Sequence, residues 1–115
     1  MSVQIIHNPR CSKSRQTLAL LEENGVTPEV LEYLKTPLTA EEISSILSKL
    51  EVNVRDIIRT KEAEYKENGL DDSSLTDEQI IDVLVNVPKL IERPIVINGE
   101  KAAIGRPPEN VLAII

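Results

Sequence analysis

The fold is decided at residues 3–15, which read VQIIHNPRCSKSR. Val3–Ile6 is a short apolar run that stops at the turn signal Asn8-Pro9, so it predicts a buried strand. A helical pattern follows over Thr17–Asn24 and places Cys11 where a strand turns into a helix. The unpaired N–H groups and partial positive charge of a first helical turn favour the thiolate, and such positions lower a cysteine pKa from about 8.5 to about 3.5–7.5.

The charge around this cysteine is opposite in sign to that of the whole chain. The chain has a formal net charge of -6, but no Asp or Glu occurs before Glu22, whereas Arg10, Lys13 and Arg15 surround Cys11. A positive field in an acidic protein suits a thiolate or an anionic ligand. It argues against nucleic acid or an anionic membrane as the main partner.

A structural interpretation of the same residues stands beside this one. A lone cysteine is usually a small buried hydrophobe, although the helix start and the three cations favour a reactive role here. Cys11 and Ser14 also have the spacing of a Cys-x-x-Cys motif that has lost its second thiol. His7 is either a hydrogen-bonded loop residue or a partner of the thiolate.

Composition limits the class of protein. With 115 residues we expect one domain, 1–115, and because Phe and Trp are absent its core must be aliphatic. A single cysteine cannot form an internal disulfide, and no leader or apolar run of about 20 residues is evident, so we expect a cytoplasmic protein without a membrane partner. One Cys and one His do not supply a zinc site, and no phosphate-binding or dinucleotide motif is present. We therefore expect no bound cofactor and no metal. We also expect the protein to be a monomer.

The first third of the chain predicts a strand, a helix and a second strand. The helix is expected to have Ser12 as its N-cap and Gly25 as its C-terminal stop. Val30–Tyr33 is the second strand candidate. Three such elements in about 30 residues predict a right-handed parallel unit with the cysteine loop at the carboxyl end of the first strand.

The middle third predicts a helical insertion over about residues 38–88. Two helices are indicated by Thr39 with Glu42 and by Thr76 with Gln79, because a threonine followed three positions later by Glu or Gln forms a capping box. Each box precedes an apolar stripe with helical spacing. Between the two helices, Val54–Arg59 is expected to be a short helix and Tyr65–Ser74 a loop.

The last third predicts a β-hairpin and a closing helix. The hairpin is indicated by Pro94–Ile97, the turn signal Asn98-Gly99 and the strand Lys101–Ile104, and the closing helix runs from Pro107 to Ile115. The resulting order is that of a thioredoxin-like α/β fold. We expect a four-stranded mixed sheet with a helical insertion after the second strand.

Four ordered motifs carry a resemblance to a known family. They stand at residues 8–15 (NPRCSKSR), 59–62 (RTKE), 88–96 (PKLIERPIV) and 105–109 (GRPPE). Together they resemble the glutaredoxin-dependent arsenate reductase family, which is ArsC-like and has a thioredoxin-like fold. The resemblance implies reduction of arsenate to arsenite, with glutathione as co-substrate and glutaredoxin as protein partner.

The resemblance also implies roles for individual residues. The family's nucleophilic cysteine matches Cys11. Its three oxyanion-binding arginines match Arg59, Arg93 and Arg106. The histidine that helps to acidify the thiol matches His7, and the cis-proline beside the active site matches Pro94.

The chemistry of these residue types agrees with that implication. Arsenate is a tetrahedral oxyanion, and planar guanidinium groups neutralise and orient its oxygens better than lysine does. Backbone N–H groups of the Cys11–Arg15 turn offer a second cradle for the anion. Because the chain has one cysteine, the sulfur that resolves an adduct on Cys11 has to come from outside.

Several interpretations stay open at this stage. Spacing alone favours a salt bridge for Arg59, for example with Glu62, over a role in catalysis. Arg93 and Arg106 are better candidates because they flank the predicted hairpin. The function could instead be that of a monothiol redox protein acting on glutathione mixed disulfides, or of a regulatory protein of the same fold that binds RNA polymerase. Such regulators commonly keep a Cys-x-x-Cys switch, and Ser14 stands at its second position.

Overall fold

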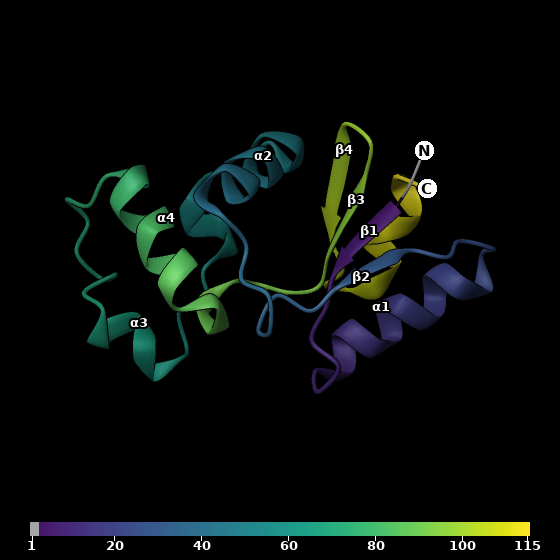
Figure 1. Cartoon of the computed structure of the whole chain (residues 1–115), viewed down its shortest axis with the longest axis horizontal. Helices are drawn as coiled ribbons and strands as arrows, with labels where there is room; N and C mark the ends of the chain where they lie inside the picture. The colour runs from purple at the N-terminus through teal and green to yellow at the C-terminus, as the bar shows by residue number, and fades with distance from the viewer. Residues whose placement is uncertain (1–2) are drawn as a thin grey trace. The chain divides into compact units, whose positions relative to one another are not determined.

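The computed structural model describes residues 3–115, which divide into two compact units. The first unit is made of the chain up to Thr36 together with Arg93–Ile115, and the second unit is Pro37–Glu92 (Figure 1). The second unit contains the helical insertion expected over about residues 38–88. That the chain 1–115 forms a single domain stays a prediction.

The first unit is built on a four-stranded mixed sheet. Its strands are β1 (Val3–Ile6), β2 (Glu29–Leu31), β3 (Ile95–Asn98) and β4 (Lys101–Ile104), arranged in the order β2-β1-β3-β4. β1 pairs in parallel with β2 and antiparallel with β3, and β3 pairs antiparallel with β4. The predicted thioredoxin-like α/β fold is therefore confirmed.

Helix α1 (Ser12–Glu23) follows β1 and packs on the sheet. Its N-cap is Cys11, so the prediction that Ser12 caps the helix is wrong: the helix begins one residue earlier than a hydroxyl cap would require. Its end is as predicted, because Gly25 takes a φ of 78° and the N–H of Val26 donates to the carbonyl of Leu21 at 2.9 Å, as in a Schellman motif.

One face of the sheet carries the aliphatic core of the first unit. Ile5 and Val96 from the sheet, Leu21 from α1 and Val111 near the C-terminus have no exposed surface and form one cluster. Val111 lies in the closing helix η3 (Pro108–Ala113), which contacts α1 and β4. This helix is of the 3-10 type and ends at Ala113, so the prediction of a helix to Ile115 is corrected in type and length.

Two predicted strand boundaries shift by a residue or more. β2 ends at Leu31, and Tyr33 lies beyond it with 1% of its surface exposed, so its burial does not come from a place in the sheet. In the hairpin, Asn98 pairs with Lys101, so the connecting residues are Gly99 and Glu100 rather than Asn98 and Gly99. Gly99 takes the positive φ of 62° that this tight turn requires.

The second unit is helical, and both predicted capping boxes are present. α2 (Ala40–Leu50) and α4 (Asp77–Asn86) are capped by Thr39 and Thr76, whose hydroxyls accept from the N–H groups of Glu42 and Gln79. The expected helix near residue 54 is a shorter 3-10 helix, η1 (Val54–Ile57). A further 3-10 turn, η2 (Pro88–Leu90), follows α4.

The predicted loop over Tyr65–Ser74 is partly wrong. A short helix, α3 (Ala63–Glu67), overlaps its first residues. None of the α3 residues is buried, so the helix has no apolar stripe that could have revealed it in the sequence. Within residues 3–115 no helix is long and apolar enough to cross a membrane.

The end of the hairpin is held tightly against α1 at Gly105. A Cβ on this residue would lie 2.6 Å from Thr17 Oγ1 and 2.8 Å from Pro94 Cγ. The Gly105 N–H donates to the carbonyl of Pro94 at 2.9 Å. Because real Cβ atoms do not approach so closely, only glycine fits here without movement of α1 or of the chain before β3.

We therefore expect Gly105→Ala to lower the free energy of unfolding by about 1–3 kcal/mol, the usual cost of overpacking. Urea unfolding followed by circular dichroism measures this. Thr17→Ala removes one of the two colliding side chains, so the double variant should lose less than the sum of the two single variants. An unchanged urea midpoint in Gly105→Ala would contradict the close contact.

Candidate functional site

Cys11 lies between β1 and α1, where it is the N-cap residue of α1. Its N–H donates to the carbonyl of Asn8 at 3.0 Å, and its carbonyl accepts from the N–H of Arg15 at 3.0 Å, which is the first hydrogen bond of the helix. The thiol is free, and 8% of the residue is exposed. The backbone of Cys11 is thus fixed by a hydrogen bond on each side, and little of the residue is exposed.

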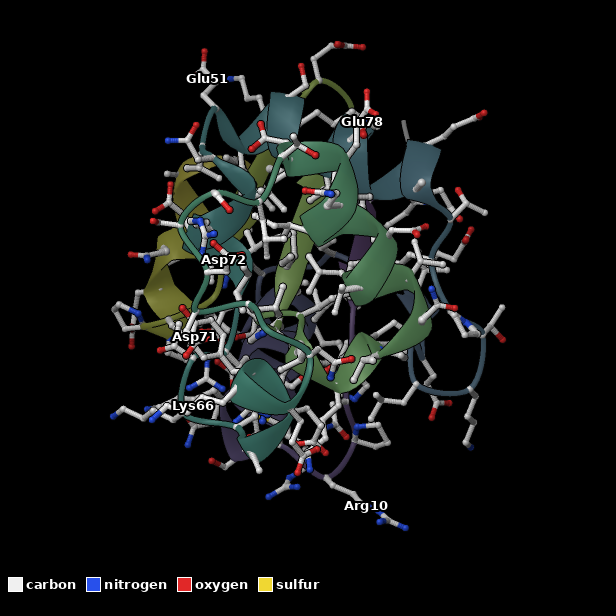
Figure 2. All side chains as sticks on the ribbon, turned by 90° about the vertical axis from the view of Figure 1, so that its left-hand side faces the viewer. Arg10, Glu51, Lys66, Asp71, Asp72 and Glu78 are labelled. Carbon is white, nitrogen blue, oxygen red and sulfur yellow. The ribbon has the colours of Figure 1, made fainter. Side chains whose placement is uncertain are left out.

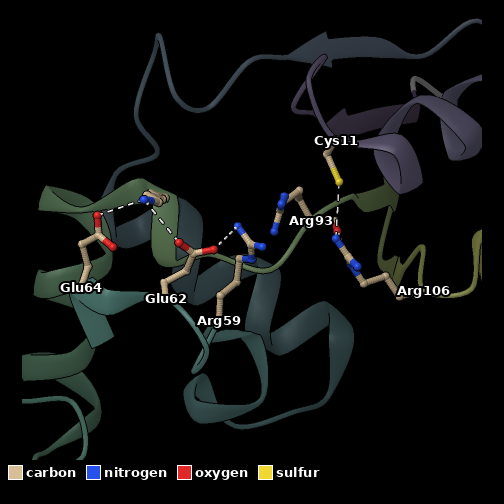
Figure 3. A network of polar contacts seen from close by, with 7 residues as sticks. Cys11, Arg59, Glu62, Glu64, Arg93 and Arg106 are labelled. Carbon is tan, nitrogen blue, oxygen red and sulfur yellow. Dashed lines mark hydrogen bonds and ion pairs between the residues drawn. The ribbon is translucent and has the colours of Figure 1, made fainter. Parts of the chain in front are cut away.

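Two arginines that are distant in sequence meet at this sulfur. The Nη2 of Arg106 donates to Cys11 Sγ at 3.4 Å, and the Nε of Arg106 donates to the carbonyl oxygen of Arg93 at 2.8 Å (Figure 3). The Arg93 side chain is buried. The structure therefore brings together three of the predicted site residues.

The hairpin explains why these arginines converge. Ile95 of β3 pairs with Ile104 of β4. Arg93 lies two positions before β3 and Arg106 two positions after β4, so both lie just beyond the same end of the hairpin. Both arginines precede a proline, and the Arg93–Pro94 and Arg106–Pro107 bonds are cis. The family resemblance implied the cis form at Pro94; the second cis-proline was not anticipated.

The electrostatic surroundings of Cys11 favour its ionised form. Burial, the largest single influence, raises the pKa of the thiol, but the backbone N–H of Ser14, the charges of Arg93 and Arg106, and the N–H of Lys13 all lower it. The pKa of Cys11 is therefore below its ordinary value. The Cys11 side chain accepts no capping hydrogen bond of standard geometry, so these N–H groups act on the sulfur mainly as oriented dipoles.

His7 contacts Ser14. Its Nδ1 lies 2.6 Å from Ser14 Oγ, which also accepts from the N–H of Asn8 at 3.0 Å. Burial and the nearby Arg15 lower the pKa of His7 more than Glu32 raises it, so the imidazole is neutral near pH 7. His7 is not one of the described groups that shift the pKa of Cys11. That His7 acidifies the thiol directly stays a prediction, and a route through Ser14 is the one that its contacts offer.

The first turn of α1 carries cations where helices usually carry acids. Lys13 and Arg15 occupy this turn, and it contains no acidic residue. The first turns of α2 and α4 instead carry Glu41 with Glu42, and Asp77 with Glu78. A cation at a helix N-terminus costs about 0.3–1 kcal/mol, so α1 departs from the pattern of α2 and α4.

Arg59 belongs to the second unit and forms an ion pair with Glu62 there. Its Nη1 lies 3.0 Å from Glu62 Oε1, and Lys89 Nζ lies 3.3 Å from Glu62 Oε2 and 3.1 Å from Glu64 Oε2 (Figure 3). The alternative of a salt bridge with Glu62 is thus present in the structure. The oxyanion-binding role of Arg59 stays a prediction.

Sequence reasoning missed two features of this region. Lys89 was not expected to bridge Glu62 and Glu64, because the partners lie 25 or more positions apart and nothing local links them. The hydrogen bond from Arg106 to the Arg93 carbonyl was likewise invisible without the hairpin register. Within residues 3–115 no group of three or more His, Cys, Asp or Glu is placed to hold a metal ion.

The comparisons with known proteins agree with one another. The family model described as the ArsC family matches residues 6–114. The Escherichia coli (strain K12) protein named "Uncharacterized protein YfgD" is 56% identical over 98% of this chain and 96% of its own length. A Haemophilus influenzae protein named "Arsenate reductase" is 50% identical over the full length of both chains. The solved structure of "Arsenate reductase from Vibrio cholerae" is 51% identical, with a TM-score of 0.97 over 100% of this chain and 98% of that one.

We expect Arg106→Gln to raise the pKa of Cys11, because the change removes a positive charge in contact with the sulfur. The pH dependence of alkylation by iodoacetamide measures the shift. Arg15→Gln is the matched control: Arg15 donates to the carbonyl of Pro9 and does not contact the sulfur. His7→Ala should shift the curve less than Arg106→Gln. Equal shifts in Arg106→Gln and Arg15→Gln would contradict the assignment.

The lowered pKa of Cys11 also makes a prediction about stability. Between the folded pKa and the unfolded value of about 8.5, the folded protein binds fewer protons than the unfolded chain, so the thiol's contribution to stability rises with pH across this window. That contribution is lost as the pH falls through the folded pKa. We expect the difference in unfolding free energy between wild type and Cys11→Ser, measured in urea with a reductant, to follow this curve. A difference that does not change with pH would count against ionisation of Cys11.

Proposed function

This chain belongs to the ArsC family, and we propose that it reduces arsenate to arsenite with Cys11 as the nucleophile. The observation that carries the proposal is the Arg106 guanidinium 3.4 Å from Cys11 Sγ, with the pKa of the thiol lowered. A thiolate beside a guanidinium group can both attack an oxyanion and offset the repulsion between the two negative charges. Support also comes from the relatives named arsenate reductase at 46–50% identity.

In the proposed first step the Cys11 thiolate attacks the arsenic atom. A sulfur–arsenic bond forms, and an arsenate oxygen leaves as hydroxide or, after protonation, as water. Arg93 and Arg106 would neutralise the remaining oxygens, and the N–H groups of Ser14 and Lys13 would face the same anion from the helix end. Because these donors are already in place, little reorganisation is needed when charge develops.

In the second step glutathione acts as co-substrate. Its sulfur bonds to Cys11 Sγ, the sulfur–arsenic bond breaks, and the electron pair of that bond reduces As(V) to As(III), which leaves as arsenite. Cys11 is then held as a mixed disulfide with glutathione. The chain has no second cysteine, so an external thiol must regenerate it, and we assign this step to glutaredoxin. A reducing, cytoplasmic location is part of the same proposal.

A coupled assay tests this function. Purified protein is mixed with arsenate, glutathione, glutaredoxin, glutathione reductase and NADPH, and NADPH oxidation is followed. Arsenate-dependent turnover supports the proposal. Turnover with a glutathione mixed disulfide but none with arsenate would make the chain a monothiol redox protein. Binding to RNA polymerase with neither activity would indicate a regulatory protein.

Variants assign the roles within that assay. Cys11→Ser should abolish turnover and leave the fold intact, because the hydroxyl is not ionised at neutral pH. Arg106→Ala should lower kcat/KM for arsenate by about 10²-fold, the usual effect of losing one oxyanion donor, and Arg93→Ala should act in the same direction. Lys101→Ala, an exposed change on β4, is the control and should leave turnover unchanged. Retained turnover in Cys11→Ser would end the proposal.

A further inference from the structure

The cations around Cys11 fall into two groups. Arg93 and Arg106 act on the sulfur, and Arg15 donates to the carbonyl of Pro9. Arg10 and Lys13 do neither. Both are exposed, and in the described part of the chain neither side chain forms an ion pair or a side-chain hydrogen bond. Figure 2 shows Arg10 reaching outward, away from the ribbon.

Lys13 is also poorly placed for the stability of α1. It lies in the first helical turn, where the helix dipole disfavours a cation, whereas α2 and α4 carry acids at the equivalent place. The preference for acids in the first turn holds in α2 and α4 and fails in α1, beside Cys11. The stability of α1 therefore does not account for a cation at Lys13. Departures from local rules of this kind gather at functional sites.

The net charge of the chain shows what that purpose could be. At -6 the protein as a whole repels anions, and glutathione and its disulfide are anionic because each glutathione unit carries two carboxylates. Exposed cations one position before and two positions after Cys11 reverse the sign of the field where such a molecule must arrive. Because their charge is not engaged elsewhere in the described structure, it is available to the incoming reactant.

We propose that Arg10 and Lys13 form a cationic rim that selects carboxylate-bearing thiols and disulfides of the glutathione class over neutral or cationic ones. The inference rests on the proposed function only in that Cys11 must exchange with such a thiol. It assigns these two side chains to the co-substrate, whereas Arg93 and Arg106 serve the sulfur and the oxyanion.

The selectivity can be measured in a reaction that needs no arsenate. The Cys11 thiolate attacks a symmetrical disulfide, a new bond forms between Cys11 Sγ and one disulfide sulfur, and the other leaves as a thiolate. Cys11 is oxidised and the disulfide is the oxidant, so no further reagent is required. Three probes differ in charge: oxidised glutathione is anionic, hydroxyethyl disulfide is neutral and cystamine is cationic.

The test variant is Arg10→Gln/Lys13→Gln, and its rates of mixed-disulfide formation are followed by mass spectrometry. We expect the rate with oxidised glutathione to fall about tenfold, as for lost electrostatic steering, while the rate with hydroxyethyl disulfide changes less than about twofold and that with cystamine rises. The difference between the wild type and this variant in the rate with oxidised glutathione should shrink at high salt, because screening shortens the reach of exposed charges.

A matched control separates the rim from net charge. Lys66→Gln/Lys101→Gln removes the same amount of charge from two exposed lysines on α3 and β4 and should keep the wild-type order of the three rates. An equal fall with all three disulfides in Arg10→Gln/Lys13→Gln would mean that only the reactivity of the thiolate had changed, and would overturn the inference. So would an unchanged rate with oxidised glutathione.

A second variant gives a readout that a structural role would not produce. Lys13→Glu places an acid in the first turn of α1, so we expect its thermal midpoint to rise while its preference for oxidised glutathione over cystamine falls. A fall in both would assign Lys13 to the fold and overturn its place in the rim. If arsenate turnover fails but the charge preference is found, the proposed function is wrong and the cationic rim stands. If arsenate is turned over but the charge preference is not found, the proposed function stands and the cationic rim is wrong.

Discussion

The contact between the Arg106 guanidinium and the Cys11 sulfur is the interaction on which the site depends. It joins residues 95 positions apart, so it exists only if the sheet forms in the right register. The pairing of Ile95 with Ile104 sets that register, and Gly105 lets the end of the hairpin approach Thr17 of α1 closely. A slip of one residue in this pairing would turn each β4 side chain to the other face of the sheet. The contact between Arg106 and Cys11 therefore forms only when the sheet has folded in this register.

The balance of influences on Cys11 shows why several weak donors are needed. Burial alone would keep the thiol protonated, and it is the largest single influence. The helix end, Arg93 and Arg106 act together against it, and each comes from a different part of the chain. Partial burial is still useful, since charges act more strongly in a less polar environment than they do in water. The pKa of the sulfur is thus lowered at a place where two guanidinium groups and the N–H groups of a helix end lie beside it.

Much of this arrangement could be predicted from local sequence. The strand before Cys11, the capping boxes at Thr39 and Thr76 and the hairpin rest on interactions within a few residues, and the structure confirms them. Cys11 stood out because a strand-to-helix junction with three nearby cations is a local pattern.

The remaining features depend on contacts that no local pattern encodes. The helix α3 buries none of its residues, and the burial of Tyr33 comes from tertiary packing beyond β2. The meeting of Arg106 with Cys11 requires the hairpin register, so the sequence could offer Arg106 only as a candidate. Arg59 shows the opposite case. Its salt bridge with Glu62 is a local i,i+3 contact, and the spacing of the two residues in the sequence was enough to predict it.

Ser14 shows how the residue at one position can decide where the resolving thiol must come from. It stands where a second thiol would complete a Cys-x-x-Cys motif, and its hydroxyl is buried and engaged with His7 and with the N–H of Asn8. Ser14 is therefore held in the first turn of α1, and as a hydroxyl in place of a thiol it offers no sulfur to resolve an adduct on Cys11. An enzyme with two thiols carries its resolving sulfur within the fold, but a chain with one must select that sulfur from solution. In the proposed mechanism, recognition of that thiol falls to exposed residues around Cys11, among them the cations Arg10 and Lys13.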